Sequence, residues 1–181
     1  MKQTLLIASA VVLLLAAAAS AQTVQNGAGT LALGGQVDGS LSLILNQDSN
    51  GASFLTGDGT PTATMTYGEV SYYGTANGLL GSKFTKTSDG SGFTLTTTFD
   101  ITVNEANLPS SESCHVTAQM NGPDGLTWSV NSTTVTSASA TSVITGLAYA
   151  TKTPYPMAVT IPITQDHANL NNTFNFTAIP D

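Results

Sequence analysis

The sequence predicts an all-β protein with an antiparallel, immunoglobulin-like β-sandwich fold. Apolar and β-branched residues recur at every second position in most segments, as expected of strands that bury one face. Clusters of Gly, Asn and Asp separate these runs at intervals of about 10–15 residues. This short spacing favours an antiparallel sandwich over a parallel sheet, whose strands need longer crossover connections.

Residues 1–21 are predicted to be a cleaved secretory signal peptide. Lys2 supplies the positive start, Leu5–Ala18 is the apolar stretch, and Ala19–Ala21 has the small-x-small form of a cleavage site. A retained N-terminal anchor is the alternative. Because no later stretch could span a bilayer as a helix, we expect no stable membrane insertion after cleavage. The protein is therefore expected to be secreted, extracellular or on the cell surface, with periplasmic transit in a Gram-negative source.

Residues 22–38 are predicted to form a Gly-rich N-terminal arm, and residues 39–181 to form the sandwich domain. The arm carries one short apolar alternation at Leu31 and Leu33, followed by two glycines, and this composition is typical of a flexible segment with one weak strand.

The domain is expected to contain strands along most of its length, with one exception. A helical turn is predicted at 104–113, where Asn104 could cap it and Pro109 would end it. The last strand alternates cleanly, with Phe174 and Phe176 on its apolar face. The expected strands lie at 39–46, 60–70, 92–104, 115–120, 126–131, 141–150, 155–164 and 169–181.

The charge balance excludes two classes of partner. Charged residues make up 8% of the chain, Arg is absent, and three Lys follow the signal against eleven Asp and Glu. Nucleic-acid binding needs clustered positive charge, so a nucleic-acid partner is not expected. Anionic membrane surfaces are excluded for the same reason.

The sequence contains no recognisable catalytic machinery, so we expect neither an enzyme nor a bound cofactor. Cys114, the single cysteine, shares its parity with apolar neighbours and is expected to be a small buried residue, with an intermolecular disulfide as the alternative. His115 points to the opposite face of the same strand. Asp166 and His167 are adjacent, but the chain lacks a nucleophile elbow to accompany them.

One turn resembles the front of a calcium loop. Residues 46–51 read NQDSNG, with Asp48 at the third loop position. The twelfth position is Gly57, where such a loop needs a bidentate Glu. We therefore expect a hairpin turn and no metal site, although Asp58 keeps a calcium ion near Asp48 as an open alternative.

The aromatic residues admit a second kind of site. Trp128 lies in phase with Leu126 and Val130, which predicts a core residue. Tyr72 and Tyr73 are neighbours on a predicted strand, so one should point outward. These two rings are candidates for a face that stacks on a polysaccharide.

The segment MTYGEVSYYGT, residues 65–75, resembles the strand and turn of the spore-coat-protein-U-like or archaic chaperone–usher pilin group of exported β-sandwich domains. The order of features is also similar: a signal peptide, an arm, a leading strand, the Tyr67-Gly68-x-Val70 element, and a last strand that alternates Asn, Thr and Phe. Two features differ, because these pilins commonly hold a disulfide and have Phe where this chain has Tyr67.

The resemblance implies assembly by donor-strand exchange, in which the arm of one subunit fills a groove in its neighbour. The donor residues would be Val24, Leu31, Leu33 and Val37, and the pair Gly34–Gly35 would act as a hinge. Phe174 and Phe176 would lie beneath the acceptor groove. The alternative is an arm that pairs with its own sheet or is disordered.

These observations lead to two functional hypotheses. The first is a non-catalytic structural subunit of a bacterial extracellular fibre, pilus-like (fimbrial) filament or surface matrix, which associates with itself or with related subunits through β-strand addition. The alternative is a secreted carbohydrate-binding or cell-adhesion module that acts as a monomer.

Overall fold

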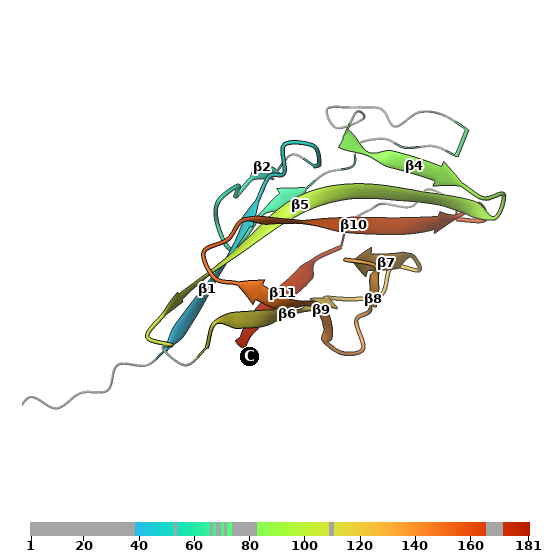
Figure 1. Ribbon diagram of the computed structural model, residues 1–181. Helices are drawn as coiled ribbons and strands as arrows, with labels where there is room; N and C mark the ends of the chain where they lie inside the picture. Colours follow the sequence, from blue (N-terminus) through green and yellow to red (C-terminus); the bar gives the residue numbers. More distant parts are fainter. Residues whose placement is uncertain are drawn as a thin grey trace, which may run out of the picture. The chain divides into compact units, whose positions relative to one another are not determined.

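The described part of the chain consists of β-strands joined by turns, and it contains no helix (Figure 1). Within these residues, nothing meets the length and apolarity that a membrane-spanning helix requires. The predicted signal peptide and arm lie outside them. The computed structural model describes residues 39–52, 54–65, 67, 70, 72–73, 83–108, 111–165 and 172–181.

The strands follow the alternation of the sequence. Odd-numbered positions of β5 from 93 to 103 are buried, and so are the even-numbered positions of β6, because each strand turns every second side chain inward. The strands are β1 (Ser40–Asn46), β2 (Phe54–Thr56), β3 (Thr64–Met65), β4 (Thr85–Ser88), β5 (Gly92–Ala106), β6 (Ser113–Met120), β7 (Thr127–Val130), β8 (Thr133–Val135), β9 (Thr141–Ala148), β10 (Thr153–Pro162) and β11 (Phe174–Pro180).

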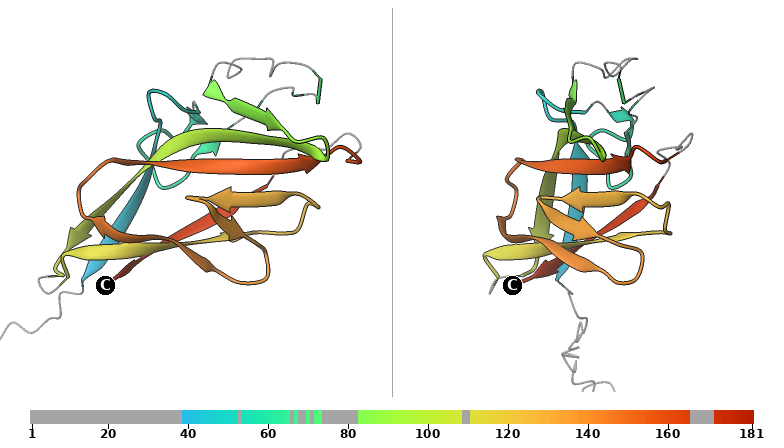
Figure 2. Two further views of the ribbon diagram at one scale, coloured as in Figure 1. Left: turned by 45° about the vertical axis from the view of Figure 1, so that its right-hand side comes forward. Right: turned by 90° about the vertical axis from the view of Figure 1, so that its right-hand side faces the viewer.

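Two antiparallel sheets hold most of these strands. The larger sheet has the order β1-β5-β10-β7-β8, with β4 also on β5, and the smaller has the order β11-β6-β9. Figure 2 shows β5 and β10 in one layer and β6, β9 and β11 in the other. A separate pair, β2 and β3, completes the described strands. The predicted all-β class with antiparallel pairing is confirmed, and the arrangement is consistent with a β-sandwich.

The long strand β5 carries two neighbours on one edge. β1 pairs with residues 100–106 and β4 with residues 93–96. Between them, the Ala52 amide donates to the Thr98 carbonyl at 3.0 Å. Gly51 makes this approach possible, because a Cβ there would lie 2.0 Å from the Thr98 carbonyl oxygen.

The inner faces of both sheets share one apolar core. The larger sheet contributes Leu95 and Val159, and the smaller contributes Val116, all fully buried. Trp128 is 2% exposed, so its predicted place in the core is confirmed. The remaining buried apolar residues of this core are Tyr67, Phe93, Phe99, Ile101, Val103, Cys114, Ala118, Met120, Val130, Val135, Val143, Ile144, Leu147, Met157 and Ile161.

The predicted helical turn at 104–113 is wrong. β5 continues to Ala106, still paired with β1, and the chain then turns at Asn107 with φ of 59°. The pairing partner decided the outcome, because β1 supplies hydrogen bonds up to Ser40 that outweigh the capping preference of Asn104. The strand expected at 60–70 is also mostly wrong, since only β3 forms among its described residues.

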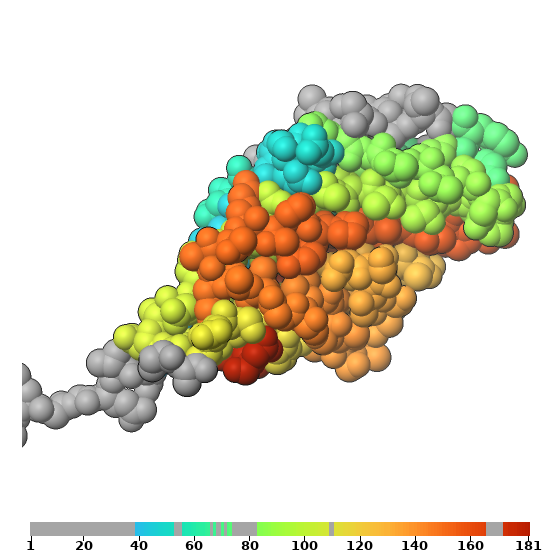
Figure 3. All heavy atoms as spheres, viewed as in Figure 1, coloured from blue at the N-terminus to red at the C-terminus, as the bar shows by residue number. Residues whose placement is uncertain are grey.

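The two sheets are joined by the chain itself on one side. The segment between β8 and β9 crosses from the larger sheet to the smaller, and the Met120 amide donates to the Thr136 carbonyl at 3.1 Å. Two side-chain amides reinforce the crossing: Asn131 Nδ2 donates to Val143 O at 2.9 Å, and Gln119 Nε2 donates to Ser137 O at 3.0 Å. Figure 3 shows the orange atoms, which belong to the part of the chain from β8 to β10, together on one face of the molecule. This side of the molecule is therefore closed.

Candidate functional site: a groove between two strand edges

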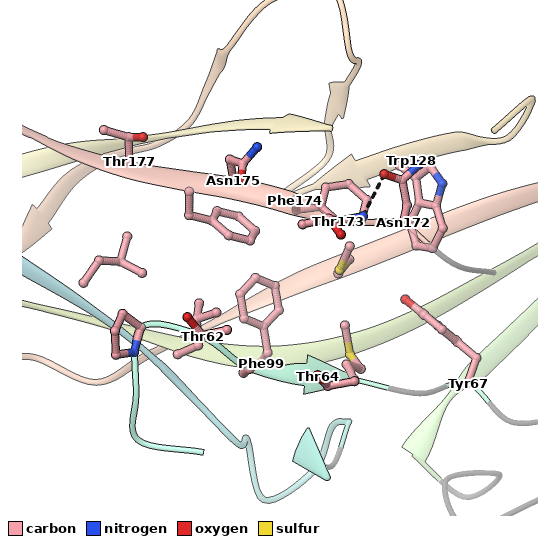
Figure 4. A pocket seen from close by; sticks show the side chains of 17 residues that line it. Thr62, Thr64, Tyr67, Phe99, Trp128, Asn172, Thr173, Phe174, Asn175 and Thr177 are labelled. Atoms are coloured by element: carbon pink, nitrogen blue, oxygen red, sulfur yellow. Dashed lines mark hydrogen bonds between the residues drawn. The ribbon is translucent and has the colours of Figure 1, made fainter. Parts of the chain in front are cut away.

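A groove of about 630 Å³ lies on the opposite side, between β11 on one wall and β1 with the segment 61–65 on the other (Figure 4). We call it the edge groove. Its lining residues are Leu43, Leu45, Pro61, Thr62, Ala63, Thr64, Met65, Tyr67, Phe99, Trp128, Met157, Asn172, Thr173, Phe174, Asn175, Phe176 and Thr177.

The floor of the edge groove is aromatic and apolar. Phe99 from β5 and Trp128 from β7 are each 2% exposed. Phe174 packs edge-on against Trp128 with ring centroids 5.1 Å apart, and Phe176 lies 5.8 Å from Phe99. Both β11 phenylalanines are half-buried. The structure thus places Phe174 and Phe176, the predicted acceptor residues, together in the lining of one groove.

The edge of β11 that faces away from β6 has no partner strand within the part of the chain that the structure describes. The Asn121 amide donates to Thr173 O at 2.8 Å, and the Asp181 amide donates to Ser113 O at 3.1 Å. Because hydrogen-bonded pairs alternate in an antiparallel ladder, the peptide groups of Phe174, Phe176 and Ala178 point the other way. Among the described strands, β11 pairs only with β6.

β1 presents a similar edge to the same side of the molecule. Leu45 exchanges hydrogen bonds with the turn before β3, donating to Thr60 O and accepting from the Gly59 amide, each at 2.9 Å. By the same alternation, the Leu41 and Leu43 peptide groups also point away from β5. Among the described strands, β1 pairs only with β5. Two strand edges therefore border one groove with an apolar floor and polar Thr and Asn side chains in its lining.

A carboxylate fixes one end of the groove. Asp124 Oδ2 accepts from Trp128 Nε1 at 2.7 Å and from Asn172 Nδ2 at 2.9 Å, while its Oδ1 accepts from the Leu126 amide at 2.9 Å. The Thr173 amide donates to Asn172 Oδ1 at 2.8 Å, the bond dashed in Figure 4. Asp124 therefore orients the indole and ties it to the start of β11. The sequence analysis did not predict this role. Its one signal is that Asp often accepts from the amide two residues later in an Asx turn, as Asp124 does from Leu126.

Tyr67 lies in the lining with its hydroxyl directed toward the groove beside Trp128 (Figure 4). Its ring stacks on Phe84 at 4.7 Å and meets Trp128 edge-on at 6.0 Å. The residue is 5% exposed, and its hydroxyl has no hydrogen-bond partner among the described residues. Burial raises the pKa of this phenol far above its usual value.

The proposed sugar-binding tyrosines do not line the edge groove. Tyr73 is 92% exposed and Tyr72 is half-buried, so one ring points outward as expected. The two rings meet edge-on at 4.8 Å, and Tyr72 packs against Phe93 at 6.1 Å. Lys86 Nζ donates to the Tyr72 carbonyl at 2.6 Å, which anchors the pair to the sheet.

The calcium-like turn is held by hydrogen bonds to the carboxylates of Asp48 and Asp58. Asp48 accepts from Thr98 Oγ1 and from the Asn50 amide, and these two bonds hold the pKa of its carboxyl below the usual value. Asp58 Oδ1 accepts from the Gln47 amide at 2.7 Å. In the described ranges no three His, Cys, Asp or Glu side chains gather as a metal site.

The remaining predicted residues fall into two groups. Cys114 is fully buried, as predicted, and burial raises the pKa of its thiol. His115 lies on the opposite face, where its Nδ1 is 2.9 Å from Asp181 Oδ1. The donor residues Val24, Leu31, Leu33 and Val37 lie outside the described residues, as do Asp166 and His167.

No family model matches this chain, and neither a curated protein nor a solved structure matches it.

Proposed function

We propose that this chain is a non-catalytic structural subunit of a bacterial extracellular fibre, pilus-like filament or surface matrix. It is exported by its N-terminal signal, and its immunoglobulin-like sandwich accepts an extended strand from another copy or a related subunit. The observation that carries this proposal is the edge groove, which is apolar at its floor and bordered by the edges of β1 and β11.

The chemistry of the groove suits a β-strand. Unpaired peptide groups along an edge supply main-chain hydrogen bonds to an added strand, whose alternate side chains then enter the groove. An apolar floor with the rings of Phe174 and Phe176 favours aliphatic side chains at those alternate positions. A strand therefore satisfies both the edges and the floor.

The occupant we assign is the arm at residues 22–38 of a second copy. Leu31 and Leu33 share one face of an extended chain and would enter the groove. Val37 shares that face and Val24 has the opposite parity, and both would be outer contacts. The pair Gly34–Gly35 gives the segment a hinge between the donor strand and β1. The arm is also long enough, because 17 residues of extended chain span about 55 Å.

The test compares charges on the two faces of the arm. In the full chain, Leu31→Asp with Leu33→Asp should abolish oligomer ladders in size-exclusion chromatography and filaments in negative-stain electron microscopy, because two carboxylates cannot enter an apolar groove. The matched control, Thr30→Asp with Ala32→Asp, adds the same charge to the opposite face and should assemble. Equal assembly of both variants would reject the arm as the donor.

A monomeric carbohydrate-binding or adhesion module is the second candidate, because a tyrosine that is 92% exposed favours ring stacking on a sugar. In that case the chain should sediment with an insoluble polysaccharide and lose retention in Tyr72→Ala with Tyr73→Ala. Unchanged retention of this variant would remove the proposed face.

A further inference from the structure

Among the described residues, the Tyr67 hydroxyl is the one buried side-chain polar atom without a hydrogen-bond partner, and Tyr67 lines the edge groove. It is buried with its ring, lies beside Trp128, and finds no partner among the described residues. Folding has removed this hydroxyl from water without replacing its hydrogen bonds, which costs free energy. A phenylalanine at position 67 would stack on Phe84 equally well, so ring packing does not explain why residue 67 carries a hydroxyl.

The surroundings define what the hydroxyl can bind. The phenol is protonated at neutral pH, as any tyrosine with a pKa near 10 or above is, so it can donate one hydrogen bond. None of the described residues that line the edge groove carries a charge. A carboxylate brought here would lose its hydration without a compensating cation. The fitting partner is a neutral acceptor, and an amide carbonyl oxygen is the strongest such acceptor that a strand carries.

We infer that Tyr67 is a polar specificity point of the edge groove, where its hydroxyl donates to a side-chain amide oxygen of the entering strand. This inference rests on the proposed function, since it concerns the strand that the groove accepts. Within the arm, Gln25 shares the face of Leu31 and Leu33, because all three are odd-numbered positions of an extended segment. Gln25 is therefore the residue assigned to Tyr67.

The groove would then select an entering strand by two features. Aliphatic residues satisfy the apolar floor, and one side-chain amide on the same face of the strand satisfies Tyr67. A strand with an apolar residue in place of the amide would leave the hydroxyl unpaired, and such unpaired buried groups are what polar sites use to reject wrong partners. The groove thereby selects its own arm over other apolar strands.

The experiment measures binding of a fluorescent peptide with the sequence of residues 22–37. The receptor is the full chain carrying Leu31→Asp and Leu33→Asp, so that its own arm does not compete. A second receptor carries Tyr67→Phe in addition. We expect the second receptor to bind the peptide about five- to ten-fold more weakly, the loss of one hydrogen bond. Its melting temperature should not fall, because the hydroxyl has no partner to lose in the free protein.

A peptide with Gln25→Leu completes the double-mutant cycle. It should bind the Tyr67 receptor more weakly by a similar factor and bind both receptors within two-fold of one another, because the coupled pair is then already broken. A lower melting temperature for Tyr67→Phe would mean that the hydroxyl serves the fold, and it would overturn the inference.

Three binding outcomes would also overturn it, at different levels. Equal affinity of both receptors for the original peptide would reject Tyr67 as a specificity point while leaving strand acceptance intact. Loss of affinity in Tyr67→Phe alone, with no effect of Gln25→Leu, would reject Gln25 as the partner. A peptide that binds neither receptor would reject the proposed function, and this inference with it.

Discussion

Asp124 shows how one side chain positions a candidate site without belonging to its lining. Its carboxylate accepts from the indole of Trp128, from Asn172 and from the Leu126 amide. Removing it leaves a nearly buried indole N–H without its acceptor, and it leaves Asn172 Nδ2 with only the Gly122 carbonyl, at 3.0 Å, as an acceptor. Asp124 is therefore more important to the groove than its place in a turn suggests.

We expect Asp124→Ala to lower the free energy of unfolding by about 1–3 kcal/mol, the cost of leaving buried donors unpaired. Asp124→Asn keeps one acceptor oxygen and should lose less. Urea unfolding followed by fluorescence is a direct measurement, because Trp128 is the only tryptophan of the chain. An Asp124→Ala variant with an unchanged urea midpoint and unchanged emission would contradict this role.

Asp48 gives a pH dependence whose sign follows from its hydrogen bonds. Thr98 and the Asn50 amide lower the pKa of its carboxyl in the folded state. A group with a lowered folded pKa stabilises the protein above its unfolded pKa, about 3.9, and this contribution is lost as the pH falls through the folded pKa.

The full chain should therefore lose stability on acidification below about pH 4, and part of that loss should disappear in Asp48→Asn. Melting temperatures between pH 2 and pH 6 measure the difference. Asp58→Asn serves as the control, because it removes another carboxylate that accepts one hydrogen bond from this turn, the bond from the Gln47 amide. Parallel curves for Asp48→Asn and the parent chain would contradict the assignment.

At the scale of the elements, β11 is the strand that decides whether the groove can accept a partner. Its inward face was predictable, because Phe174, Phe176 and Ala178 alternate with polar residues. The position of β11 at a sheet edge was not predictable, because it depends on which strands pair, and one sequence does not specify that order. Pro180 is the one signal that could have helped: it has the parity of the outward peptide groups, where a missing N–H breaks no ladder bond.

This orientation predicts that proline is tolerated at one position of β11 and destabilising at the next. Ala178→Pro should change the free energy of unfolding by less than about 1 kcal/mol, because the Ala178 N–H points away from β6. Thr177→Pro should cost about 1–3 kcal/mol or more, because it removes a bond to β6. Chemical denaturation of the two variants gives the comparison. Equal losses would contradict the assigned edge.

Other elements show why local sequence signals can be misleading. Asn104 and Pro109 suggest a capped turn, yet β1 extends β5 to Ala106 by pairing with it. The strand expected at 60–70 carries its alternation into a loop instead. Thr60 lies between the turn at Gly57–Gly59 and Pro61, and it forms a single β-bridge with Leu45 in place of a strand. In both places the result depended on a partner strand distant in the sequence.

At the scale of the domain that the structure describes, the two sides between the sheets differ, as the proposed strand acceptance requires. One side is closed by the crossing between β8 and β9, with side-chain amides bonded across it. The other side leaves two strand edges beside an apolar groove. The apolar alternation of the sequence predicted the core and both β11 phenylalanines. The groove itself depends on which strands lie at the edges of the two sheets, and the pattern of one strand does not contain that order.

The central claim is that the arm of one copy occupies the edge groove of another, and a site-specific photo-crosslink tests it most directly. A photoreactive phenylalanine analogue would replace Leu33 in full chains, and isotope-labelled and unlabelled copies would be mixed before assembly. We predict crosslinks between copies, mapped by mass spectrometry to the segment 61–65 or to Phe174–Thr177. Crosslinks confined to one copy, or to residues outside the edge groove, would contradict the account.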